Sequence, residues 1–154
     1  MDKGERLYTA LKTLVEISRE TQQEVLSRNS GYGIKSWAKD FCTIHAGTSR
    51  GSGHDYALTR FLANDVNGAI VLFQNQQLKN IFRREYVNHT LKDPKYNSIY
   101  LCSLNSRDYF GISNIDTVVI CHSFLLGRKG RDKIYNNFIP TLDRTKPFFF
   151  IFLQ

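Results

Sequence analysis

The chain has 154 residues, a size typical of one domain, and its hydrophobic fraction of 42% and charged fraction of 23% exclude wholesale disorder. Its formal net charge of +7 favours an anionic partner, such as nucleic acid or a phosphorylated ligand. No apolar stretch approaches the roughly 20 residues that span a bilayer, and the N-terminus lacks the apolar core of a signal peptide. Cys42, Cys102 and Cys121 are odd in number and widely spaced, which excludes a disulfide framework and a C-x-x-C zinc motif. We therefore expect a cytoplasmic protein that does not contact a membrane.

The apolar pattern predicts an amphipathic helix followed by strands and helices in alternation. The first helix covers residues 6–28 and ends at a glycine-containing loop. Five strands are predicted, at residues 41–46, 69–73, 98–103, 117–121 and 148–153. Three further helices are predicted at residues 54–64, 76–89 and 130–143, and Pro140 is expected to bend the last of them.

Strands that alternate with helices are typical of a mainly parallel sheet covered on both faces. We therefore predict a single α/β domain over residues 1–154, in which residues 1–33 form an N-terminal helix and loop and residues 34–154 form a core with a five-stranded sheet. Ligands of such sheets bind beyond the carboxyl ends of the strands. Polar and glycine-rich segments follow several of the predicted strands, so we expect the functional site at that edge.

A glycine-rich segment follows the first predicted strand and precedes a helix, a position in which backbone N–H groups and a helix N-terminus bind phosphate. The segment departs from the Walker A pattern, because His54 and Asp55 stand where Lys and Ser or Thr would be, and Gly47 lies one residue too far upstream. The predicted anion-binding residues are Arg50, Gly51, Ser52, Gly53, His54 and Asp55.

With its motifs in this order, the chain resembles the P-loop NTPases, and in particular the first RecA-like half of helicase and terminase ATPases. Residues 70–79 look like the strand-to-helix motif that contacts nucleic acid in that group, and residues 148–154 look like the strand that leads to its sensor motif. The Walker B-like position falls on Cys121, His122 and Ser123. The chain is also similar to small phage-encoded proteins with a glycine–histidine variant of the loop, which implies a viral accessory protein in the host cytoplasm.

The catalytic groups that this resemblance implies are missing. His54, which is mostly neutral at pH 7, replaces the Lys, and Cys121 and His122 replace the acidic residues of the Walker B position. Losing one such electrostatic contact typically costs about 10²–10³ in rate. We therefore predict a pseudo-ATPase with no catalytic residues and no metal site, in which NTP hydrolysis is weak or absent. The resemblance implies ATP or another nucleotide as the ligand, and the missing metal-holding Asp argues against Mg²⁺.

The densest basic segment lies directly after the fourth predicted strand, and its residues would contact a phosphate backbone. The predicted nucleic-acid-binding residues are Arg128, Lys129, Arg131, Lys133 and Gln76. Our first hypothesis is a catalytically degenerate P-loop-like protein that binds nucleic acid or a nucleic-acid-processing partner. Two alternatives stay open. One is an unusual NTP-binding enzyme in which a protonated His54 replaces the Lys, and the other is a ligand-free interaction protein or inhibitor of a host enzyme.

Histidines at strand ends suggest two further kinds of site. His45 and His122 would suit a two-histidine phosphoesterase, but the hydroxyl residue that should follow each histidine stands at the wrong offset. A zinc site from these two residues with His54 and Asp55 is chemically conceivable, although nothing in their spacing requires it. A Cys121 nucleophile beside His122 is disfavoured, because adjacent strand residues point to opposite faces.

Overall fold

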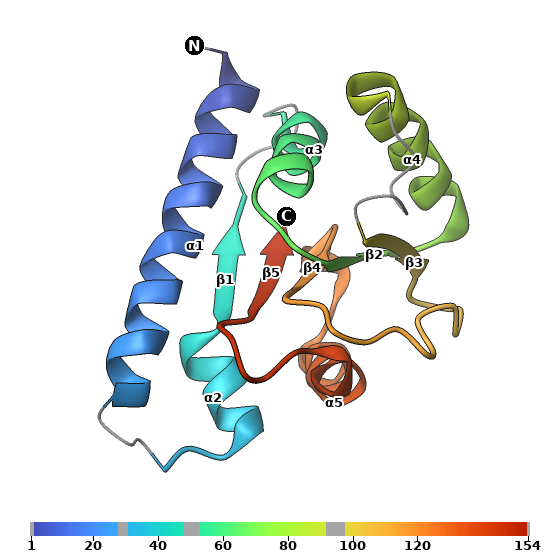
Figure 1. Ribbon diagram of the computed structural model, residues 1–154. Helices are drawn as coiled ribbons and strands as arrows, with labels where there is room; N and C mark the ends of the chain where they lie inside the picture. Colours follow the sequence, from blue (N-terminus) through green and yellow to red (C-terminus); the bar gives the residue numbers. More distant parts are fainter. Residues whose placement is uncertain (1, 28–30, 48–52, 92–97, 154) are drawn as a thin grey trace.

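The computed structural model of the protein describes residues 2–27, 31–47, 53–91 and 98–153. Five strands form one sheet with helices on both of its faces (Figure 1). Each strand pairing in the described residues is parallel, which confirms the predicted α/β class with a five-stranded sheet and an N-terminal helix. Within the described ranges, no helix combines the length and the apolar character that a membrane span requires.

The sheet places the last strand of the chain between the first and the fourth. Its strands are β1 (Thr43–Ala46), β2 (Ala69–Phe73), β3 (Ile99–Ser103), β4 (Thr117–Ile120) and β5 (Phe149–Leu153), in the order β1-β5-β4-β2-β3. Ile151 of β5 is paired with Ile44 on one side and with Val119 on the other. All five residues of β5 are buried, as expected for a strand with helices on both faces.

One face of the sheet is covered by α1 (Lys3–Ser27), α3 (His54–Asn64) and α4 (Gln76–Thr90) (Figure 1). Because strand side chains alternate between faces, Val71 and Ile151 point to this side, where they share a core with Leu11 of α1 and Phe61 of α3. The predicted helix over residues 54–64 is confirmed without change. The side chain of Asn75 accepts a hydrogen bond from the N–H of Leu78 (2.9 Å) and so caps the start of α4.

The opposite face is covered by α2 (Ile34–Phe41), α5 (Arg128–Phe138) and a 3₁₀ turn, η3 (Ile139–Thr141). Trp37 of α2 and Ile134 of α5 pack there against Leu72 and Phe150 of the sheet. Each face of the sheet therefore has its own buried core, and the sheet is the middle of three layers.

Several predicted element boundaries differ from the structure, most of all at the first strand and the last helix. Helix α2 was not predicted, and Phe41, which was assigned to the first strand, is its last residue; the strand begins only at Thr43. The last helix begins at Arg128 rather than at residue 130 and ends at Phe138. Pro140 lies in the 3₁₀ turn that follows, because a proline has no N–H with which to continue an α-helix.

Helix α1 is tied to the rest of the fold by polar contacts near both of its ends. Near its start, the carboxylate of Glu5 accepts hydrogen bonds from the hydroxyl of Tyr56 and the guanidinium of Arg60. Near its end, the amide of the buried Gln22 donates to the carbonyl of Phe148 (3.0 Å) and accepts from the N–H of Phe148 (3.4 Å). These contacts fix α1 against α3 and against the segment that enters β5.

Candidate functional site

The carboxyl edge of the sheet is where the chain changes from one face to the other. Because the strands are parallel, β1, β2 and β4 all end at this edge, and the helices that follow them begin there. The connections after β1 and β2 lead to α3 and α4 on one face, and the connection after β4 leads to α5 on the opposite face. In α/β sheets, such a reversal is the usual place for a ligand.

The start of α3 holds the described part of the predicted anion-binding turn. Gly53 precedes the helix with a left-handed φ of 87°, which glycine adopts readily. A Cβ atom at Gly53 would lie 2.7 Å from the Cα of Gly4, so the close approach of α1 also requires glycine here. Arg50, Gly51 and Ser52 lie outside the described residues.

The first turn of α3 lies beside the end of β4. Burial lowers the pKa of His54, the charge of Asp55 opposes this, and the neighbouring His122 lowers the pKa further. His54 is therefore a neutral imidazole at pH 7. Burial raises the pKa of the Cys121 thiol, and the nearby carboxylate of Asp55 raises it further. The turn thus presents a neutral ring and a carboxylate at the position where a P-loop presents a cation.

The Walker B-like residues lie at the end of β4 and include no carboxylate. Cys121 is buried in the core beneath α1 and α3, and His122 has a left-handed φ of 54°. Its carbonyl accepts a hydrogen bond from the side chain of Gln74 (3.5 Å), which connects the ends of β2 and β4. Ser123 is fully buried, and its Oγ has no hydrogen-bond partner in the described part of the chain. Among the described residues, no three His, Cys, Asp or Glu side chains are grouped to hold a metal ion.

Two cations near this turn come from α1, and sequence reasoning missed them. A hollow of about 520 Å³ adjoins Gly53, and its lining includes Lys3 and Arg6 of α1 together with the carboxylate of Asp2. No spacing pattern connects these two residues with Gly53 in the sequence. The packing of α1 on α3 brings them together, so the N-terminal helix supplies positive charge close to the predicted phosphate turn.

The structure does not bring His45 and His122 together. Strand β5 lies between their strands, so their backbones are two strand spacings of about 4.8 Å each apart. The ring of His45 stacks on Phe152, with 5.3 Å between the ring centroids. Burial lowers the pKa of His45, and the charge of Arg131 lowers it further. His45 therefore lies on the same side of the edge as α5, whereas His122 lies near His54 at the start of α3.

Helices α2 and α5 carry a group of basic side chains on the face of the sheet that they cover. Helix α5 begins at the carboxyl edge, whereas α2 ends directly before β1 begins and so lies toward the amino edge (Figure 1). Lys39 Nζ lies 2.7 Å from Asp132 Oδ1, and this hydrogen bond is the main cause that lowers the pKa of the Asp132 carboxyl. Lys35 and Arg128 lower it further. Burial raises the pKa of Tyr135, whereas its hydrogen bond with Thr43 and the charges of Lys39 and Arg131 act to lower it. We call Lys35, Lys39, Arg128 and Arg131 the α2–α5 basic surface.

The structure separates the predicted nucleic-acid-binding residues into three groups. Arg128 and Arg131 belong to the α2–α5 basic surface, with Arg131 also lying over the ring of Phe152 at 5.4 Å. Lys129 and Lys133 are exposed and, being four residues apart, share another stripe of α5. Gln76 begins α4 on the opposite face of the sheet, where its side chain donates to Asn80 (3.4 Å). Lys35 and Lys39 join the first group because α2 packs against α5.

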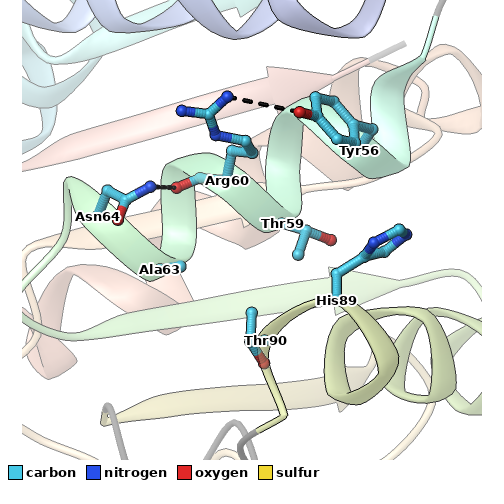
Figure 2. Close-up of a pocket in the computed structure, with 7 residues that line it drawn as sticks. All are labelled: Tyr56, Thr59, Arg60, Ala63, Asn64, His89 and Thr90. Atoms are coloured by element: carbon cyan, nitrogen blue, oxygen red, sulfur yellow. Dashed lines mark hydrogen bonds between the residues drawn. The ribbon is translucent and has the colours of Figure 1, made fainter.

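A second hollow, of about 430 Å³, lies between α3 and α4 (Figure 2). Thr59 and Thr90 line it from the two helices, and each donates its hydroxyl hydrogen to a backbone carbonyl of its own helix at 2.7 Å. Arg60 extends toward Tyr56 in Figure 2, and it also pairs with Glu5 of α1. The polar groups of this hollow therefore hold the helices in place rather than being available to a ligand. We place the candidate site at the carboxyl edge of the sheet instead.

Comparison of the chain with protein-family models and with curated protein sequences finds no match.

Proposed function

We propose that this chain is a catalytically degenerate P-loop-like protein that binds nucleic acid through the α2–α5 basic surface. One observation carries the proposal: two helices from separate parts of the chain place Lys35, Lys39 and Arg128 around a single carboxylate, Asp132, with Arg131 beside them. Cations fixed on one face neutralise phosphates, which gives binding that depends on salt and is independent of sequence.

The residues that stand in place of the Walker A lysine and the Walker B acidic pair support the degenerate part of the proposal. The side chains of His54, Cys121 and His122 supply neither the fixed cation nor the metal-holding carboxylate that phosphoryl transfer requires. The lowered pKa of His54 also weighs against the alternative in which a protonated His54 replaces the Lys, since burial disfavours the charged ring. We therefore expect weak nucleotide binding at most, without appreciable hydrolysis.

The origin and location of the protein belong to the same proposal. Cys42, Cys102 and Cys121 are all buried free thiols, which suits a reducing compartment such as the host cytoplasm. A viral accessory role rests on the resemblance to phage-encoded proteins. A protein that holds a nucleic-acid-processing enzyme without touching nucleic acid is the alternative that a direct binding assay separates from this one.

The test is fluorescence anisotropy with labelled single- and double-stranded DNA across a salt series from about 50 to 200 mM. Wild-type protein should bind at low salt, and the affinity should fall steeply as salt rises. Arg128→Gln and Lys35→Gln should each weaken binding and reduce the slope of log affinity against log salt by about 1. Asp132→Asn should strengthen binding, because it removes the carboxylate from the centre of the surface.

Arg144→Gln is the matched control. It removes the same charge from an exposed residue between η3 and β5 that is not one of the four residues of the α2–α5 basic surface. It should change the affinity less than twofold. Absence of binding at low salt refutes the proposal, and an Arg144 effect equal to the Arg128 effect assigns binding to net charge rather than to this surface.

A further inference from the structure

The connection from β4 to α5 exposes two consecutive large apolar side chains. Phe124 is 62% exposed and Leu125 is 59% exposed, although a side chain of this kind is stabilised by burial. Both lie in a 3₁₀ turn, η2 (Ser123–Leu125), that begins after His122. The two exposed side chains therefore belong to a turn with regular structure, and this turn lies at the same edge of the sheet as the candidate site.

Two backbone hydrogen bonds within the turn hold its conformation. The N–H of Leu125 donates to the carbonyl of His122 (3.1 Å), and the N–H of Leu126 donates to the carbonyl of Ser123 (3.0 Å). Ser123 is fully buried beneath the turn, so the backbone is held while the next two side chains extend outward. The ring of Phe124 lies close to perpendicular to the imidazole of His122, at 77° with 6.3 Å between centroids.

Positive charge follows this turn directly. The turn ends at Leu126, Gly127 precedes α5 in an extended conformation, and α5 begins with Arg128 and Lys129. An exposed aromatic ring within a few residues of an exposed cation offers one contact to a flat apolar group and another to an anion. Single-stranded nucleic acid carries both groups in every nucleotide, whereas a duplex hides the faces of its bases in the stack.

We infer that Phe124 is a base-stacking platform for single-stranded nucleic acid, whose phosphates lie along Arg128 and the rest of the α2–α5 basic surface. This inference rests on the proposed function and adds a preference for unpaired strands. Leu125 supplies an apolar contact beside the stacked base. Stacking is tolerant of sequence because every base has a π face, so the preference is for strandedness rather than for a base.

The test measures the affinity of the full chain for labelled oligo(dT) of about 20 nucleotides, longer than the roughly 4–16 nucleotides that such sites cover, and for a duplex of equal length. Wild-type protein should bind the single strand more tightly. Phe124→Ala should weaken single-strand binding about 5- to 100-fold and change duplex binding less than about twofold. Phe124→Trp should retain the affinity, and its added fluorescence should be quenched by the oligonucleotide, whereas that of the buried Trp37 should not.

Phe124→Leu and Phe110→Ala are the matched controls. Leu keeps an apolar side chain without a π face, so it should not restore the affinity that Ala loses. Phe110 is 64% exposed and lies after β3, the edge strand farthest from β1, so its removal should have no effect.

The outcomes separate this inference from the proposed function. If DNA binds and Arg128→Gln weakens it, but Phe124→Ala does not, the stacking inference is wrong and the proposed function stands. Full rescue by Phe124→Leu, or an equal loss in Phe110→Ala, also overturns stacking and points to a general apolar contact such as a protein partner would make. If neither oligonucleotide binds, both the proposed function and this inference are refuted.

Discussion

Removal of the Gln22 amide should destabilise the whole fold, because this side chain satisfies two backbone groups of the segment that enters β5. Gln22 is 1% exposed and Phe148 is 2% exposed, so water does not reach them readily. In Gln22→Ala, the carbonyl and the N–H of Phe148 lose bonds of 3.0 and 3.4 Å. A buried backbone group without a partner costs about 1–3 kcal/mol, and the longer bond contributes less. We expect a loss of about 2–4 kcal/mol in the free energy of unfolding.

Urea denaturation followed by circular dichroism measures this loss. With a urea m-value of about 2 kcal/mol/M, the midpoint should fall by about 1–2 M and the m-value should stay unchanged. Gln23→Ala, which removes the same side chain from the exposed neighbouring position of α1, should change stability by less than about 0.5 kcal/mol. Gln22→Met keeps the volume without the hydrogen bonds. If it matches the wild type, or if Gln22→Ala behaves like Gln23→Ala, the amide contributes nothing and the reasoning is refuted.

Two further predictions concern the start of α3. Gly53→Ala should destabilise the protein by about 1–3 kcal/mol more than Gly31→Ala. Both glycines have a positive φ, so both variants strain the backbone. Only at residue 53 would the added Cβ also meet backbone, the Cα of Gly4 at 2.7 Å, whereas a Cβ at residue 31 has no atom within 4 Å. Equal losses in urea denaturation would show that α1 moves aside at little cost. The pKa of His54 is lowered in the fold from its ordinary value of 6.5, so the unfolded chain takes up its proton first and the free energy of unfolding should fall as pH decreases from about 7 to 5. His54→Gln should flatten this dependence relative to His89→Gln, whose histidine is half exposed on α4, and an unchanged slope would contradict the assignment.

The strands and the longer helices are predictable from the sequence because their apolar patterns are continuous. Residues 69–73 form an unbroken apolar run, and they lie in β2 with all five side chains buried. Helix α2 was missed because its last residue, Phe41, adjoins the apolar run that continues into β1, and the run hides the boundary at Cys42. The spacing of Trp37, Ala38 and Phe41, at i, i+1 and i+4, was the available sign of a short helix with one buried side.

The start of α5 was misplaced because two glycines lie close together there, one before the helix and one inside it. Gly130 was taken as the boundary, whereas Gly127 precedes the helix in an extended conformation and Gly130 lies inside it. The N-terminal residues of α5 therefore include Arg128 and Lys129, which sequence reasoning had placed in the preceding connection.

The sequence predicts at which edge of the sheet the candidate site lies, but not all of the residues that form it. Parallel strands end together, so the sequence suffices to place His54, Asp55, Cys121 and His122 at one edge of the sheet. The partners of Arg128 and Arg131 depend on the packing of α2 on α5, and the cations beside Gly53 depend on the packing of α1 on α3. Neither contact can be read from the sequence. Each joins two helices that are far apart along the chain, and no residue spacing shows that they pack together.

The place of β5 in the sheet has a consequence for the order in which the protein folds. β2 and β3 are neighbours joined by one helix, so this pair can form early from nearby residues. Among the described strands, β1 pairs only with β5, and the partner of Thr43 is Phe150, more than 100 residues later in the chain. During synthesis, the apolar side chains of β1 and α1 therefore cannot pack against β5 until that strand has left the ribosome. Such distant pairing slows folding and exposes strand edges to other chains, so we expect slow refolding and a need for chaperones that grows with temperature.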